Sequence, residues 1–369
     1  MRKPSLPLVL SLALGACTCA PIPEADPIPD IVVDERGDGD GPRLLSVQAF
    51  LQPADYATRA RFEARLRGFL DEAADREMLN ERTVVVLPEY TGSWLVAEGE
   101  GAGVYEQPEL GGAMTDLAMA HLPGFLWRSW TAGVDDGDAF AAFSEKSERM
   151  AALYDDVMGT LAQEFAITLV GGSIILPDAR IEDGVVVVTA GEPLQNVSVV
   201  YDASGDAIAI SRKVFPTKDE QGFVSAAEPA DIAVVDTPAG RLGVLVCADA
   251  WFPESYERLQ AEGAELLAVP TFHSGDDMWG KDWNGYSGHQ EPDDVDDDDI
   301  GTLTEATAWD KYALAGRAAA AGIKGAVSAP LRGSLWDMGD DGQAFLVDAE
   351  GFARMENVDA PGLFLLRLP

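Results

Sequence analysis

The 369-residue chain has few basic residues: 26 Lys and Arg stand against 63 Asp and Glu, which gives a formal net charge of −37. Such a surface repels the phosphates of nucleic acids and the headgroups of anionic lipids. We therefore expect no nucleic-acid partner and no basic membrane-binding patch. Three cysteines and three histidines are also too few to build a disulfide framework or a zinc pattern.

The chain also lacks an apolar run long enough to cross a membrane, which takes about 20 residues. Its first apolar run, residues 6–14, is shorter and follows Arg2 and Lys3, a pattern typical of a signal peptide. The next residues, Leu14-Gly-Ala-Cys17, resemble the bacterial lipoprotein box. The resemblance implies cleavage before Cys17, a lipid on its sulfur, and a place in the cell envelope. Because Thr18 rather than Asp follows, the outer membrane is favoured; an ordinary secretory signal is the alternative.

Composition divides the rest of the chain in two. Residues 18–42 are rich in Pro, Asp and Gly and have little apolar surface to bury. We therefore predict a signal peptide over residues 1–16, a disordered acidic tether over residues 17–42, and one catalytic domain over residues 43–369. The length and the 47% hydrophobic content of the chain suffice for one large core.

Three reactive side chains follow short apolar runs that predict buried strands. Residues 83–87 lead through Pro88 to Glu89, and the alternating residues 207–212 lead to Lys213. Residues 242–246 lead to Cys247, after which Pro253 suits the first turn of a helix. Each residue type alone is weak evidence, but all three at strand ends suggest one site.

These three groups have complementary chemistry. A free thiol has a pKa near 8.5, so little thiolate is present at neutral pH. A carboxylate such as Glu89 can take the thiol proton, and an ammonium such as Lys213 favours the thiolate and then an oxyanion. The backbone N–H of Ala248 is a second candidate oxyanion donor. This chemistry needs no metal and no organic cofactor.

The segment Cys247-Ala-Asp-Ala-Trp-Phe-Pro-Glu254 resembles the nucleophile motif of the nitrilase superfamily, the carbon–nitrogen hydrolases. The resemblance covers roughly residues 43–369. It implies that Glu89 is the general base, that Lys213 stabilises the tetrahedral intermediate, and that Cys247 is the nucleophile. It also implies an α-β-β-α sandwich with two mixed sheets, and pairing of two copies into a homodimer.

The family often has a second glutamate that hydrogen-bonds the catalytic lysine. Glu220, seven residues after Lys213, is the candidate, although it could equally be a solvated loop acid. His273 invites a Cys–His dyad, but a papain-like order of Cys and His is absent.

Three further segments have open interpretations. Residues 97–150 are expected to form an insertion that roofs the site, in which Trp127 and Trp130 either line a substrate pocket or serve packing. The acidic residues 275–300 predict a solvated loop, with calcium binding as the alternative. The Ala-rich residues 305–321 predict one helix.

The predicted function is therefore hydrolysis of a small non-peptide amide, or a related C–N bond, through a thioester on Cys247. One alternative is an N-acyltransferase, in which an amine rather than water resolves the thioester. The other is a surface-binding lipoprotein without catalysis.

Overall fold

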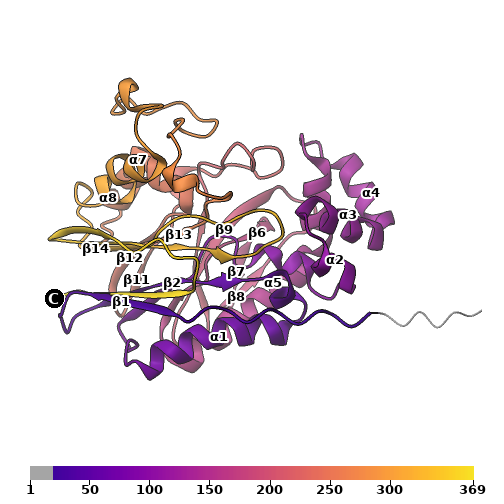
Figure 1. Cartoon of the computed structure of the whole chain (residues 1–369), viewed down its shortest axis with the longest axis horizontal. Coiled ribbons are helices and arrows are strands. Elements are labelled where there is room, and N and C mark those ends of the chain that lie inside the picture. Colours follow the sequence, from indigo (N-terminus) through magenta and orange to yellow (C-terminus); the bar gives the residue numbers. More distant parts are fainter. Residues whose placement is uncertain (1–19) are drawn as a thin grey trace, which may run out of the picture.

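The computed structural model describes residues 20–369, in which two mixed β-sheets form the centre (Figure 1). The first sheet contains, in spatial order, β1 (Val32–Arg36), β18 (Gly362–Arg367), β2 (Arg43–Gln48), β4 (Thr83–Val86), β5 (Thr168–Val170), β9 (Leu194–Tyr201) and β10 (Ala207–Arg212), and β6 (Ile174–Pro177) also pairs with β9. The second contains β11 (Val234–Thr237), β12 (Gly240–Val244), β13 (Leu266–Thr271), β14 (Gly325–Pro330), β16 (Phe345–Asp348) and β17 (Gly351–Arg354). Two short pairs join β3 (Phe50–Leu51) to β15 (Arg332–Gly333) and β7 (Arg180–Glu182) to β8 (Val185–Val187).

Helices pack against the outer faces of the two sheets and, at one end of the molecule, against one another. They are α1 (Arg59–Asp75), α2 (Ala102–Glu106), α3 (Leu110–Ala120), α4 (Leu122–Thr131), α5 (Gly137–Phe165), α6 (Pro253–Ala261), α7 (Glu305–Tyr312) and α8 (Leu314–Arg317). None of the helices in the described part of the chain is long and apolar enough to span a membrane.

Three apolar layers hold the sheets and helices together. Alternate residues of β4 serve two of them: Val84 and Val86 face the second sheet, and Val85 packs with the residues of α1 and α5. On the other side, Leu267 and Val269 of β13 pack with residues of α6, α7 and α8. Because each sheet buries both faces, the predicted α-β-β-α sandwich is confirmed.

Local sequence signals account for the helices nearest the site. Thr58 caps α1 by accepting a hydrogen bond from the N–H of Arg61, and the buried face of α1 repeats with helical spacing. Pro253 occupies the first turn of α6, where its missing N–H would have no partner. The predicted single helix over residues 305–321 is wrong in part, because the backbone at Ala313 leaves the helical conformation and separates α7 from α8.

The prediction of a disordered tether over residues 17–42 is wrong for part of that range. β1 forms the edge of the first sheet and pairs in parallel with β18, and Arg36 forms an ion pair with Asp348. Gly39 packs against the chain end so closely that a Cβ there would lie 2.0 Å from the carbonyl oxygen of Leu368. The composition of residues 18–42 as a whole did not indicate this five-residue edge strand. The strand is stabilised by backbone pairing rather than by a long apolar run.

Removing residues 1–42 should therefore destabilise the protein relative to removing residues 1–19. The longer deletion exposes apolar surface on β18 and takes away Val32 and Val33, a loss of about 2 kcal/mol or more in free energy of unfolding. Urea unfolding of the two truncated chains measures the difference. Identical midpoints would show that β1 adds nothing to stability.

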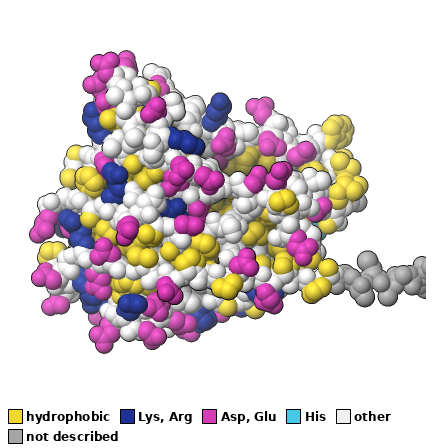
Figure 2. All heavy atoms as spheres, in the orientation of Figure 1, with side chains coloured by type: hydrophobic (Ala, Val, Ile, Leu, Met, Phe, Trp, Pro, Cys, Tyr) yellow, Lys and Arg dark blue, Asp and Glu magenta, His cyan; other side chains and the backbone are white. Residues whose placement is uncertain are grey.

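Acidic side chains are spread over the face shown in Figure 2, and apolar side chains gather at the end where α3 and α4 lie. Trp127 and Trp130 belong to this apolar group, with 65% and 82% of their surfaces exposed. Their rings contact each other rather than a core. Neither proposed role, lining a substrate pocket or packing in the interior, describes these two side chains.

Candidate active site

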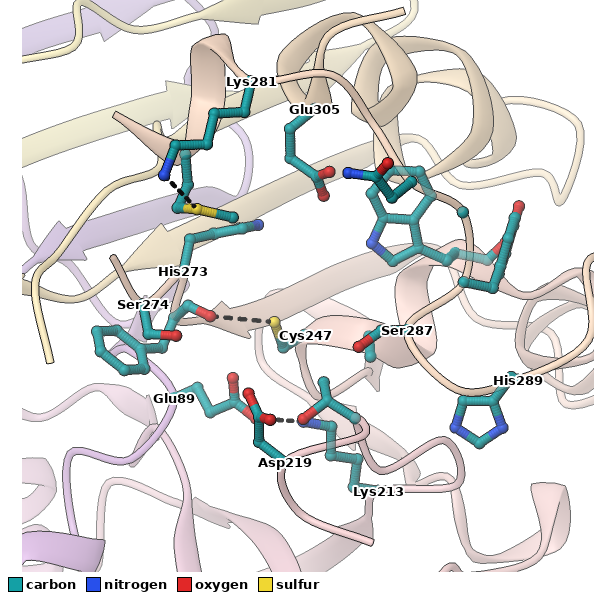
Figure 3. Close-up of a pocket in the computed structure, with 18 of the residues that line it drawn as sticks. Glu89, Lys213, Asp219, Cys247, His273, Ser274, Lys281, Ser287, His289 and Glu305 are labelled. Atoms are coloured by element: carbon teal, nitrogen blue, oxygen red, sulfur yellow. Dashed lines mark hydrogen bonds and ion pairs between the residues drawn. The ribbon is translucent and has the colours of Figure 1, made fainter. Parts of the chain in front are cut away.

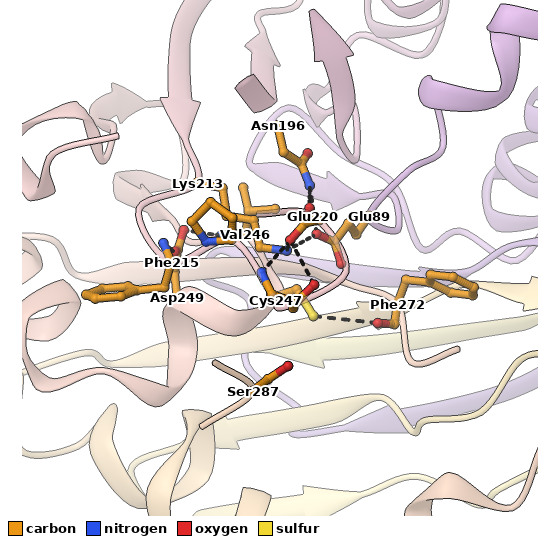
Figure 4. A network of polar contacts seen from close by, with 12 residues as sticks. Glu89, Asn196, Lys213, Phe215, Glu220, Val246, Cys247, Asp249, Phe272 and Ser287 are labelled. Atoms are coloured by element: carbon orange, nitrogen blue, oxygen red, sulfur yellow. Dashed lines mark hydrogen bonds and ion pairs between the residues drawn. The ribbon is translucent and has the colours of Figure 1, made fainter. Parts of the chain in front are cut away.

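Glu89, Lys213 and Cys247 come together where strands from both sheets end (Figures 3 and 4). Glu89 and Lys213 follow β4 and β10 of the first sheet, and Cys247 follows β12 of the second. All three side chains are buried, yet all line one pocket. The structure therefore assembles the three residues that the sequence singled out.

Two carboxylates hold the Lys213 ammonium. Its Nζ donates to Oε1 of Glu89 at 2.7 Å and to Oε2 of Glu220 at 2.6 Å. Glu220 is buried, so the alternative of a solvated loop acid is wrong. The geometry places Glu220 where the resemblance implied, as the second partner of the lysine.

Sequence reasoning missed the neutral groups that position these carboxylates. The amide of Asn196 donates to both Glu89 and Glu220, each at 2.9 Å, and the hydroxyl of Tyr90 donates to Glu220 at 2.6 Å (Figure 4). The backbone N–H of Thr217 donates to Glu220 at 2.8 Å. A polar Asn within a strand that is buried along most of its length was the available signal, since a buried polar side chain requires partners.

The backbone at Cys247 is unusual. Its φ of 46° lies in the left-handed region, which is sparsely populated by residues other than glycine. The turn aims the thiol into the pocket, 3.7 Å from the carbonyl oxygen of Phe272. The Glu89 carboxylate is near enough for its negative charge to raise the pKa of the thiol. Backbone strain of this kind persists only where surrounding contacts enforce it.

Asp249 supplies those contacts. Its carboxylate accepts hydrogen bonds from the backbone N–H groups of Val214 and Phe215, at 3.0 and 2.9 Å, and from that of Val246 at 3.2 Å. One buried side chain thus ties the turn that carries Cys247 to the segment that follows Lys213. Burial raises the pKa of Asp249 to about 7.

The two glutamates differ in protonation behaviour. Burial raises the pKa of Glu89 above that of an ordinary carboxyl group, an effect that Lys213 only partly offsets. Burial acts in the same direction on Glu220, but Lys213 and the hydrogen bonds from Tyr90 and Thr217 together outweigh it and hold the pKa of Glu220 below its usual range. Glu220 therefore stays ionised, whereas Glu89 can take up and release a proton, and such a separation typically assigns the acid and base roles.

Lys213 favours the Cys247 thiolate, as expected, but opposing effects on the pKa of the thiol are larger. Burial raises the pKa of the Cys247 thiol well above its usual value, and the negative charge of Glu89 adds to this, with Lys213 opposing only in part. Burial would lower the pKa of Lys213, but Glu220 and Glu89 more than reverse this, so the ammonium is permanent. The resting thiol is protonated, and its proton must leave as the sulfur attacks.

A pocket of about 460 Å³ opens above Cys247 (Figure 3). Trp251 and Phe252, after the cysteine turn, line one part of it, and the segment from Phe272 to His289 lines much of the rest. Part of the acidic stretch 275–300 is thus pocket wall rather than a wholly solvated loop. None of residues 97–150 is among the lining residues, so the predicted roof is wrong.

His273 lines the pocket but is not a partner of the nucleophile. Its ring packs against Trp279 and Trp309, with centroids 4.5 and 5.3 Å away, and burial lowers its pKa to about 4. Ala248 also lines the pocket, next to Cys247, where its N–H remains the predicted oxyanion donor. Cys17, the predicted lipidation site, lies outside the described residues.

No group of three or more His, Cys, Asp or Glu side chains between residues 20 and 369 is arranged to hold a metal ion. This includes the acidic residues 275–300, for which calcium was the alternative. The ion pairs and hydrogen bonds described above also satisfy Lys213 and the two glutamates without a further ligand.

Curated relatives match only parts of the chain. A deaminated glutathione amidase from Yersinia enterocolitica is 36% identical over 81 residues, which cover 20% of this chain and 28% of the relative. A bifunctional nitrilase/nitrile hydratase from Nicotiana tabacum is 26% identical over 174 residues, or 47% of this chain and 48% of the relative. The chain thus spans less than half the length of these relatives.

A solved structure of an amidase from Nesterenkonia sp. AN1 aligns over 89% of this chain and 93% of its own, with a TM-score of 0.53 and 18% identity. At that identity the likeness supports the fold alone. The sequence model of the family described as carbon-nitrogen hydrolase matches residues 64–287, more than half of the chain. The chain belongs to the carbon–nitrogen hydrolase family.

Proposed function

We propose that this protein hydrolyses a small non-peptide amide through a thioester on Cys247, with Glu89 as general base and Lys213 as oxyanion stabiliser. The observation that carries the proposal is the Lys213 ammonium, fixed between two buried carboxylates beside the thiol. A fixed positive charge next to the nucleophile stabilises the negative charge that develops on a carbonyl oxygen.

In the first half-reaction the sulfur of Cys247 attacks the carbonyl carbon while its proton passes to Glu89. The Lys213 ammonium and the N–H of Ala248 stabilise the resulting oxyanion. Glu89 then gives the proton to the departing nitrogen, the C–N bond breaks, and an amine or ammonia leaves. The product on the enzyme is a thioester.

In the second half-reaction Glu89 takes a proton from water, whose oxygen attacks the thioester carbon. The C–S bond breaks, Glu89 returns its proton to the sulfur, and a carboxylic acid leaves. The raised pKa of Glu89 suits this repeated uptake and release. Glu220, whose pKa is lowered, keeps the lysine charged and in place.

The volume of the pocket and the names of similar proteins support a small amide as the substrate. A pocket of about 460 Å³ lies toward the lower end of the usual range for small-molecule sites. The Nesterenkonia amidase has been solved with an acetamide group from fluoroacetamide on its active-site cysteine. The Yersinia relative is named as an amidase, and the Nicotiana relative acts on nitriles by name, so both bond types belong in the test.

Release of ammonia or amine from a panel of amides, carbamoyl compounds and nitriles tests this function. We expect turnover of at least one small aliphatic amide by the wild type and none by the Cys247→Ala variant. Equal release by both proteins would assign the activity to a contaminant, and no release from any compound would favour the non-catalytic alternative.

We propose that the protein is anchored in the cell envelope through lipid on Cys17, as the Leu14-Gly-Ala-Cys17 segment indicates. Labelling of cells with a palmitate analogue should mark the wild type and Cys19→Ser, which alters the neighbouring cysteine of the same segment. Cys17→Ser should lose the label. Label retained by Cys17→Ser, or a wild type that stays unlabelled, would contradict the anchor.

A homodimer is also proposed on the resemblance to the family. Light scattering on the purified protein decides it, and a mass near 39 kDa at all concentrations would exclude it.

A further inference from the structure

Three carboxylates that line the pocket, those of Asp219, Asp282 and Glu305, have no protein partner in the described part of the chain, and only that of Glu305 is partly buried. Glu305 is the first residue of α7, and its backbone N–H donates to the carbonyl of Lys281 at 2.8 Å. Within residues 20–369 its side chain has no ion pair or hydrogen bond, and burial alone raises its pKa to about 7. Figure 3 shows the carboxylate directed into the same cavity as the Cys247 sulfur. A partly buried acceptor without a donor favours a ligand that supplies one.

The charges around Glu305 do not neutralise it. Lys281 contacts Glu305 through its backbone, but its Nζ lies 3.3 Å from the sulfur of Met278 and points away from Glu305 (Figure 3). Lys213 is held by Glu89 and Glu220, and the low pKa of His273 leaves that ring neutral at pH 7. No protein cation among the described residues therefore offsets the negative charge that Glu305 acquires when it ionises, and a cationic ligand would favour the ionised form.

Other lining residues add to this preference. Asp219 and Asp282 also line the pocket, so its carboxylates outnumber its ammonium groups. The rings of Trp251 and Tyr286, whose centroids lie 5.8 Å apart, form apolar wall of the same pocket. Apolar wall also weakens solvent screening of the Glu305 charge.

We propose that Glu305 is a specificity-determining residue that selects amides carrying a cationic group, such as an ammonium, on the acyl chain. The inference rests on the proposed function, since it names the substrate class of the same site. The amide carbonyl lies at Cys247 and Lys213, and the cationic end lies at Glu305.

Pairs of amides that differ only in the terminal group isolate the effect of the substrate's positive charge. ω-Amino amides with acyl chains of three to six carbons are each compared with the amide in which a methyl replaces the ammonium. We expect the wild type to favour one or more of the ω-amino amides in kcat/KM. Glu305→Gln should lower the ratio of the two kcat/KM values about 10- to 100-fold, the usual effect of losing a hydrogen bond to a charged group.

Two further variants serve as a control and as a charge reversal. Asp71→Asn removes an exposed carboxylate on α1 and should leave the ratio unchanged. Glu305→Lys should favour amides that carry a terminal carboxylate. A ratio that Glu305→Gln does not change, with both amides still hydrolysed, overturns the inference and leaves the proposed function intact.

Binding measurements on an inactive variant test the role of Glu305 independently of catalysis. Calorimetry with Cys247→Ala measures the affinity for each pair without reaction. Tighter binding of the ω-amino amide, lost in Cys247→Ala/Glu305→Gln, supports the inference even if no amide is hydrolysed. Equal binding of both members of every pair overturns it.

Discussion

Cys247→Ala should abolish hydrolysis, with a loss of about 10⁴-fold or more, while leaving the fold in place. The substitution removes the only cysteine in the described part of the chain, and with it the atom that forms the thioester. The turn itself should survive because Asp249 holds it through three backbone N–H groups.

Steady-state assays with the best amide, together with circular dichroism and the thermal midpoint, separate chemistry from folding. Cys247→Ser is the conservative comparison, because it keeps a nucleophilic atom of higher pKa at the same position and should retain no more than traces of activity. Turnover by Cys247→Ala near that of the wild type would exclude a thioester at this residue.

Glu89→Gln should be nearly as severe, with a loss of about 10²–10⁴-fold. The amide can still accept the hydrogen bonds of Lys213 and Asn196, but it cannot take a proton from a thiol whose pKa is raised by burial. Glu220→Gln is the matched control, since it changes the other carboxylate on the same ammonium. Its effect should be smaller because Glu220 positions Lys213 and transfers no proton.

The pH profile gives a second readout. Wild-type kcat/KM should fall as pH is lowered, because protonated Glu89 cannot act as a base. Burial raises the pKa of Glu89, so this acidic limb should lie above the ordinary carboxyl value of about 4.3. Equal losses in Glu89→Gln and Glu220→Gln, or an acidic limb at the ordinary value, would contradict the assignment of Glu89 as the base.

The strand ends were predictable because local sequence marks them. A short apolar run predicts the strand, and a proline or a charged residue after it marks the end for Glu89 and Lys213. The structure has Glu89, Lys213 and Cys247 after β4, β10 and β12. Glu220 could be proposed only from the resemblance, because nothing local distinguishes a buried loop acid from a solvated one.

Contacts between distant segments could not be predicted. Asn196 reaches Glu89 across 107 positions in the chain, and no pattern within β9 names its partner. β1 is stabilised by pairing with a strand more than 300 residues away, so composition near it was misleading. Glu305 was placed in a helix, but only the folded chain shows that it faces the pocket.

The most direct test of the central claim is the mass of the Cys247 peptide during turnover. The protein is mixed with a good amide substrate, quenched in acid at early times, digested and analysed by mass spectrometry, with Cys247→Ala as the control that cannot form the thioester. We expect the acyl mass on the peptide that contains Cys247. If the enzyme is a transferase, added amine should shorten the lifetime of this thioester. Turnover with no acyl group on that peptide, or an acyl group on another residue, would contradict the central claim.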